Sequence, residues 1–192
     1  MQNQLTAYVF NHWAYNTLIM WGDLDKNQID DFLKSELIGR LGCFDGRKMY
    51  VVPVTYAFDN GFIYGHTKDG LKIHMMRNNP NVCFEIDWMK DMNNWKSVIV
   101  YGTFEELKGD DANNGLDILM KSIMSNLDRK SYPTEASDHE NHGIENYAFQ
   151  HSFLSPFLHN KNNEIFEIVV YRIKVNEATG KFGNNIESTA NN

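Results

Sequence analysis

The sequence has little cysteine and no long apolar run. Cys43 and Cys83 are the only cysteines among 192 residues, and each lies in an apolar segment, so we interpret them as buried free thiols rather than a disulfide or a metal pair. Free thiols suit a reducing compartment. No apolar stretch approaches the length of a membrane span, and no basic region leads into an apolar core near the N-terminus. We therefore expect a cytoplasmic protein.

Basic residues are too few for a polyanionic partner. The formal net charge is −7, and no long run of lysine or arginine offsets it, which argues against a general nucleic-acid or membrane-surface binder. The glycine spacings of the dinucleotide-binding fingerprint and of the P-loop are absent, and so is the nucleophile-elbow pattern. These absences argue against a Rossmann enzyme or a nucleoside triphosphatase, and we expect a small-molecule partner.

The apolar pattern predicts one mainly β domain with flanking helices. The predicted elements are helices at residues 23–35 and 115–127 and strands at residues 41–44, 49–58, 62–66, 81–88, 97–107 and 165–175. Because strands and helices do not alternate regularly, we predict a closed antiparallel barrel rather than a doubly wound sheet. The domain is expected to span residues 1–182, with an N-terminal extension at 1–24 and a flexible tail at 183–192.

Local signals mark the ends and irregular points of these elements. Asp23 or Asp25 is expected to cap the first helix. Asp-Asn-Gly at residues 59–61 predicts a hairpin, because Asn and Gly accept the positive φ angles of tight turns. Pro53 cannot donate to a strand ladder, so we expect it at an edge or a bulge. Gly102 marks a second candidate bulge.

One segment carries a candidate binding site for an anion. Residues 62–87 predict a strand, a glycine-containing bend, a short helix and another strand. The N–H groups and the dipole at a helix start favour negative charge, and Lys68 and Lys72 lie close by in the sequence. The pattern favours a phosphate-bearing cofactor. It also fits an ordinary strand–helix–strand unit with solvated lysines.

Histidines provide two further candidates. His66 ends a predicted strand beside this bend, where it could donate to a cofactor or act on a substrate. A structural histidine bonded to the backbone fits equally well. His139 and His142, with His151 and His159 further on, lie in a polar segment without a matched ligand spacing, so we predict no metal site.

The order of these pieces resembles a known family. IGRLGCF, YVVPVTY, IYGHTKDGLKIHMMRNNPNVCFEID and WKSVIVYGTFEEL follow one another over residues 29–107 as in the pyridoxamine 5′-phosphate oxidase-like family of FMN-binding split barrels. VYRIKVNEATGK adds weaker support near the end. The sequence is most similar to the flavin-nucleotide-binding branch, which includes the nitroimidazole-resistance proteins.

The resemblance implies a six-stranded antiparallel split β-barrel that forms a homodimer, with FMN in the groove between subunits. The implied cofactor-binding residues are Val52, Pro53, Val54, Thr55, Tyr64, Gly65, His66, Thr67, Lys72, Trp95 and Ser97. The first four would follow the isoalloxazine ring through main-chain contacts, the next four would line the ribityl and phosphate region, and Lys72 would pair with the phosphate. His66 is also the candidate catalytic residue of a flavin-dependent oxidoreductase, such as a nitroimidazole-type reductase, with a reduced nicotinamide as electron donor.

The chain departs from pyridoxamine phosphate oxidases proper at two places. Leu71 stands where they carry a second basic residue, and Tyr171-Arg172-Ile173 stands in place of their Arg-x-His substrate motif, so we do not expect vitamin B6 oxidation. Arg172 is instead expected to pair with an acid on a flanking strand or with a cofactor phosphate. Two alternatives stay open: a non-catalytic module that stores or senses FMN, and a haem-binding split barrel with loop histidines such as His139 as ligands.

Overall fold

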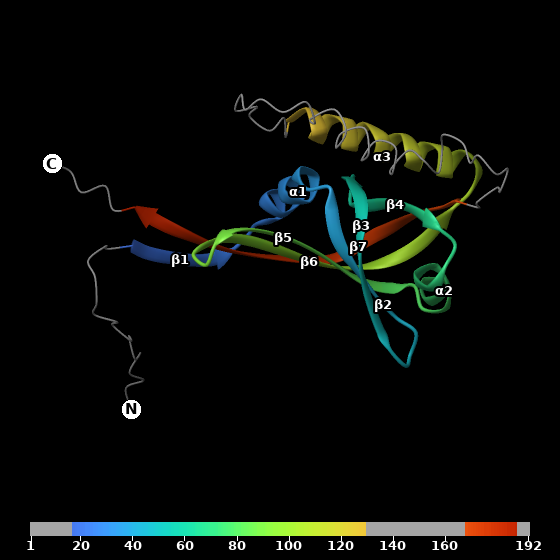
Figure 1. The fold of residues 1–192 in the computed structure, drawn as a ribbon, viewed down its shortest axis with the longest axis horizontal. Helices are drawn as coiled ribbons and strands as arrows, with labels where there is room; N and C mark the ends of the chain where they lie inside the picture. The colour runs from blue at the N-terminus through green and yellow to red at the C-terminus, as the bar shows by residue number, and fades with distance from the viewer. Residues whose placement is uncertain (1–16, 130–167, 188–192) are drawn as a thin grey trace, which may run out of the picture.

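The computed structural model describes residues 17–129 and 168–187. The elements along the chain are β1 (Thr17–Asp23), α1 (Lys26–Ser35), β2 (Ile38–Phe44), β3 (Met49–Asp59), β4 (Phe62–Lys68), α2 (Leu71–Asn78), β5 (Asn81–Asp91), β6 (Asn94–Leu107), α3 (Gly109–Arg129) and β7 (Ile168–Glu187). Figure 1 shows their arrangement around one sheet.

Six of the strands close into a ring. Their order is β7-β4-β3-β2-β5-β6, and β6 pairs back onto β7. All six pairings of the ring are antiparallel. Closure leaves fewer free sheet edges than an open sheet of this size would carry. The predicted antiparallel barrel is therefore confirmed.

A seventh strand pairs outside the ring. β1 runs antiparallel to the end of β7, from Thr17 opposite Glu187 to Asp23 opposite Lys181, and the two lie side by side in Figure 1. Residues 183–187, which fall in the segment predicted as a flexible tail, continue β7. These residues are mostly polar and lack an alternating apolar pattern, so their strand conformation depends on pairing with a segment far away in the chain.

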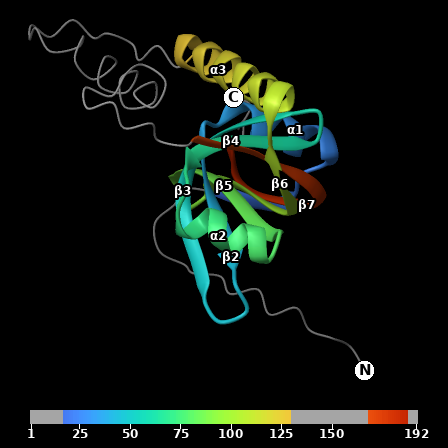
Figure 2. The ribbon, with the colours of Figure 1, turned by 90° about the vertical axis from the view of Figure 1, so that its right-hand side faces the viewer.

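The core fills the ring and extends under the helices. Residues such as Leu41, Ile63 and Phe84 form the main buried cluster. A second cluster lies between α3 and the outside of the ring, where Leu119 and Ile123 pack against residues of β3, β4 and β7. Figure 2 shows α3 lying over β4. Helix α3 begins earlier than predicted, because its first turn contains polar and acidic residues that the apolar pattern does not register.

Several local predictions are confirmed. Asp25 caps α1 through a capping box with Gln28. Asn60 and Gly61 have φ angles of 47° and 80°, as the hairpin between β3 and β4 requires. The register of β6 against β7 shifts at Gly102, where a bulge was expected.

Candidate functional site

The candidate site lies where β3 and β4 separate. The two strands pair from Asp59–Phe62 as far as Tyr56–Gly65. Beyond that pair, β3 stays with β2 and β4 stays with β7. Within residues 17–129 and 168–187, no strand pairs with the other edge of residues 49–55, which confirms the edge position predicted for Pro53. Main-chain N–H and C=O groups on this edge are available to a ligand.

Two predicted groups of residues lie on either side of this separation between β3 and β4, which we call the opening. Residues 52–55 lie on the open edge of β3, with Pro53 exposed and its neighbours half-buried. His66 and Thr67 lie on β4 just beyond the last shared pair, and α2 follows two residues after β4 ends. The two groups therefore border one opening from opposite sides.

Lys72 supplies a positive charge beside this opening. It lies in the first turn of α2, whose N-cap residue, Gly70, offers no side-chain cap. The side chain is half-buried, and burial lowers the pKa of Lys72. In the described part of the chain no carboxylate forms an ion pair with Lys72. A half-buried cation beside uncapped helix N–H groups suits an anion such as phosphate.

His66 is held mainly in its neutral form. Burial lowers its pKa, and the positive charge of Lys72 lowers it further. A neutral imidazole presents one donor and one acceptor nitrogen near pH 7. His66 can therefore donate a hydrogen bond to a ligand oxygen without adding a second positive charge.

Tyr64 and Gly65 contribute less side-chain surface than the resemblance implies. The Tyr64 ring is buried in the cluster under α3, so only its main chain could face the opening. A Cβ atom on Gly65 would overlap the ring and hydroxyl of Tyr171, which is fully buried. Tyr171 thus forms the wall behind this part of β4. Sequence reasoning missed Tyr171, because nothing in its neighbours indicates which strand it packs against.

Trp95 and Ser97 lie on another side of the ring. Both belong to β6, and β2 and β5 stand between β6 and β3 in the sheet. The indole of Trp95 lies against Gly183, where an added Cβ would come within 2.6 Å of Nε1. On the other side of β6 they pair with Gly183 and Lys181 of β7, whereas β4 pairs with residues 168–174 of β7, so the register along β7 separates them from the strand that leads to Lys72.

The outer face of the four strands β3, β2, β5 and β6 carries many exposed apolar side chains. Val51, Gly42, Cys83 and Tyr101 are aligned across all four strands. The exposed apolar residues of this outer face are Ile38, Phe44, Met49, Val51, Ile99 and Tyr101. The same face also carries the ion pairs of Arg40 with Glu85 and Asp87. Clustered exposed apolar residues mark an interaction site more often than single ones do.

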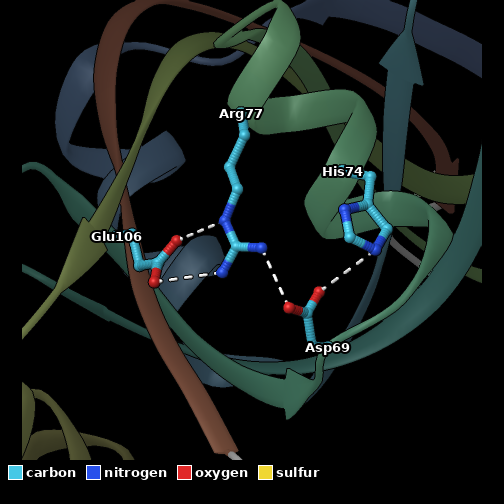
Figure 3. Close-up of polar contacts among 4 residues, drawn as sticks. All are labelled: Asp69, His74, Arg77 and Glu106. Carbon is cyan, nitrogen blue, oxygen red and sulfur yellow. Dashed lines mark hydrogen bonds and ion pairs between the residues drawn. The ribbon is translucent and has the colours of Figure 1, made fainter.

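A polar network also adjoins α2. Arg77 links Asp69, which precedes the helix, to Glu106 on β6, and His74 lies near the same aspartate (Figure 3). No sequence motif indicates this network. Its members are separated by up to 37 residues, from Asp69 to Glu106, and no local pattern joins them.

In residues 17–129 and 168–187, no group of three or more His, Cys, Asp or Glu side chains is arranged to hold a metal. His139, His142, His151 and His159 lie outside the described residues. Across the described helices, none has the length and apolar character needed to cross a bilayer.

Comparisons with known proteins identify a family and a related protein. The family described as pyridoxamine 5′-phosphate oxidase matches residues 25–151. An uncharacterised protein of Rhizobium meliloti is 39% identical over 70 residues, which are 36% of this chain and 46% of the relative, so the match spans about half of that relative.

Two solved structures share the fold. An FAD-binding protein from Mesorhizobium loti is 25% identical, with a TM-score of 0.58, over 86% of this chain and 98% of that chain. A protein provisionally assigned to 5-nitroimidazole antibiotic resistance, from Bacteroides thetaiotaomicron, is 20% identical, with a TM-score of 0.56, over 91% of this chain and 97% of that chain. The second likeness concerns the fold alone.

Proposed function

Since this chain belongs to the pyridoxamine 5′-phosphate oxidase family, we propose that it is an FMN-binding oxidoreductase that works as a homodimer on a small molecule. The observation that carries the proposal is the opening between β3 and β4. One side offers free main-chain groups on residues 52–55, and the other offers His66 and the half-buried Lys72. This pairing of a strand edge with a cationic helix start suits a planar ring joined to a phosphate.

The residues of the opening fit the parts of FMN. Lys72 and the first-turn N–H groups of α2 would hold the phosphate, and main-chain groups of residues 52–55 would hydrogen-bond the ring edge. Leu71 leaves the phosphate with a single lysine in this turn. The similar protein from Mesorhizobium loti is described as binding FAD, so the choice between FMN and FAD belongs to the test. When bound, the flavin supplies hydride or single-electron transfer.

The substrate side depends on His66. As a neutral imidazole near pH 7, it would donate a ring N–H to a substrate oxygen and position that group beside the flavin. Arg172 is directed elsewhere, because its Nε donates to Glu105 Oε2 at 2.7 Å. Its pairing with an acid on a flanking strand was predicted and is confirmed. This pairing supports a substrate other than vitamin B6 phosphates.

A second copy of the chain would complete the site. The apolar outer face of β3, β2, β5 and β6 is the surface that we assign to the dimer. Trp95 and Ser97 of one subunit would then approach the flavin held by Lys72 of the other. This assignment accounts for two residues that the family resemblance ties to the flavin but that the register along β7 separates from β4 and Lys72.

Ligand binding tests the cofactor. Purified ligand-free protein is titrated with FMN, FAD, riboflavin and haem, and binding is followed by absorption and flavin fluorescence. We expect FMN to bind at one molecule per chain and more tightly than riboflavin. A protein that binds none of these flavins refutes the proposal, and a Soret band with haem alone would favour the haem-binding alternative.

Turnover separates an enzyme from a storage module. The FMN-loaded protein is reduced anaerobically with a nicotinamide and then reoxidised by candidate acceptors, including a nitroimidazole. We expect both steps to proceed faster than with free FMN. Failure of both steps with every donor and acceptor would favour the non-catalytic module.

Mixing of variants tests the shared site. Lys72→Met and Trp95→Ala would each damage a different half of every composite site. After subunit exchange at equal amounts, about half of the dimers are mixed, each with one intact site, so about a quarter of sites should regain FMN binding. Each variant mixed with itself is the control. No recovery, or a monomer that binds FMN, contradicts the shared site.

We also propose a cytoplasmic location, which the two free cysteines favour.

A further inference from the structure

Four polar side chains join the end of β4, α2 and β6 into one network (Figure 3). Arg77 Nε and Nη2 donate to the two carboxylate oxygens of Glu106 at 2.7 and 3.1 Å, and Arg77 Nη1 donates to Asp69 Oδ2 at 2.9 Å. His74 Nε2 lies 3.6 Å from Asp69 Oδ1. The bidentate contact fixes the guanidinium in one plane and leaves its third nitrogen directed at Asp69.

Asp69 lies at an unfavourable place for anion binding. It immediately precedes Gly70, the N-cap of α2, and it lies three residues before Lys72. The hydrogen bond from Arg77 is the largest of several effects that lower the pKa of Asp69, so its carboxylate is ionised at neutral pH. An ionised carboxylate at this position opposes a phosphate at the same helix start.

Arg77 offsets that charge and also holds the helix. Without Arg77, the carboxylates of Asp69 and Glu106 would both face the bend without this counterion. Arg77 lies in the last turn of α2, and its contact with β6 ties the helix to the ring. The Arg77 side chain therefore reduces the negative electrostatic potential at the start of α2 and helps to fix the position of Lys72.

We propose that Arg77 is a positioning residue for phosphate recognition: by neutralising Asp69 and tying α2 to β6, it gives this chain its preference for a phosphorylated flavin over riboflavin. The inference rests on the proposed FMN site. It assigns no contact between Arg77 and the ligand, because the effect passes through Asp69 and Lys72.

The test compares FMN with riboflavin, which differ only in the phosphate. Dissociation constants for both are measured on the full chain at low salt for the wild type, Arg77→Met, Arg77→Lys and the double variant Arg77→Met with Asp69→Asn. We expect Arg77→Met to weaken FMN about fivefold and riboflavin less than about twofold, the upper end expected for one unbalanced charge at a partly exposed site. Arg77→Lys should keep most of the FMN preference.

The double variant separates charge from structure. Asp69→Asn removes the opposing carboxylate, so it should restore most of the FMN preference lost in Arg77→Met. The difference between FMN and riboflavin should also shrink in about 0.5 M salt, because screening weakens exposed charges. Equal weakening of both flavins by Arg77→Met, without rescue by Asp69→Asn, would show a purely structural role and overturn the inference.

Two further variants keep the test decisive. Arg172→Met is the matched control, because it removes another arginine–glutamate contact with β6, also at 2.7 Å, at the adjacent Glu105. It should leave the FMN-to-riboflavin ratio unchanged, and an equal change in this control overturns the inference. If Arg77→Met does not fold, the single variant Asp69→Asn tests the inference. Binding of FMN that is about threefold tighter, with riboflavin binding unchanged, supports the inference. Weaker FMN binding overturns it.

Failure of this inference differs from failure of the proposed function. A wild-type protein that binds no flavin, or does not distinguish FMN from riboflavin, contradicts the phosphate site itself and the inference with it. A wild type that prefers FMN and an Arg77→Met variant with the same preference overturn the inference alone.

Discussion

Replacing Lys72 with methionine should weaken phosphate binding without weakening the fold. Methionine keeps most of the length of the side chain and removes its charge. In the ligand-free protein the ammonium is half-buried, its pKa is lowered by burial, and no carboxylate of the described residues pairs with it. The charge therefore contributes little to folding, and we expect its contribution to appear when an anion binds.

Lys72→Met should lower the affinity for FMN and slightly raise the free energy of unfolding of the ligand-free protein. A hydrogen bond to a charged group contributes about 1.5–3 kcal/mol, so FMN should bind about 10- to 150-fold more weakly to Lys72→Met. Riboflavin, which lacks the phosphate, should change by less than about threefold. A fully buried CH₂ group contributes about 0.8 kcal/mol, so a half-buried methyl group in place of the ammonium should stabilise the ligand-free protein by about 0.4 kcal/mol.

Two measurements check this result. Fluorescence titration gives both dissociation constants, and urea unfolding of the ligand-free protein gives the free energy of unfolding. Lys121→Met, at an exposed position of α3, is the control and should change neither quantity. A loss of more than about 1 kcal/mol in unfolding free energy, or equal weakening of FMN and riboflavin, would refute the assignment of Lys72 to the phosphate.

Two further predictions concern His66 and Gly65. Burial lowers the pKa of His66 below its ordinary 6.5, so the unfolded chain takes up this proton first and wild-type stability should fall as the pH drops below about 6.5. His66→Gln should remove that part of the loss, spare FMN binding and slow turnover. Gly65→Ala would drive a Cβ into the buried Tyr171 ring and should lower the unfolding free energy by about 2 kcal/mol. Gly42→Ala, where the nearest atom is Cys83 O at 3.4 Å, should lose less.

Specific outcomes would contradict these two predictions. Urea midpoints at pH 5 and pH 7.5 that change equally in the wild type and His66→Gln would mean that the burial of His66 does not affect folding. Unchanged turnover in that variant would remove His66 from the catalytic role. A Gly65→Ala protein as stable as Gly42→Ala would mean that Tyr171 moves aside readily.

Local sequence signals predicted several of the secondary-structure elements. The hairpin at residues 59–61, the capped start of α1 and the helix that carries Lys72 each depend on a few neighbouring residues. Pro53 indicated an open strand edge, because proline lacks the donor that a second partner strand would need. Such signals are short-range, so they survive in a single sequence.

Other features depend on which distant segments meet. The pairing of β1 with the end of β7 overruled the polar sequence of residues 183–187, and the position of Tyr171 behind Gly65 follows from the pairing of β4 with β7. Trp95 and Ser97 were grouped with the flavin residues by resemblance, whereas the sheet order places two strands between them and β3.

The sequence by itself determined that a strand, a bend and a helix with Lys72 in its first turn follow one another, because these elements form from residues close together in the chain. Only the tertiary structure decided that the free edge of β3 borders the same opening. It also decided that Arg77 joins Asp69 to Glu106, which lies 29 residues after Arg77. Closing the ring selects one register among distant strands, and that selection depends on burial and pairing over the whole sheet rather than on local preference.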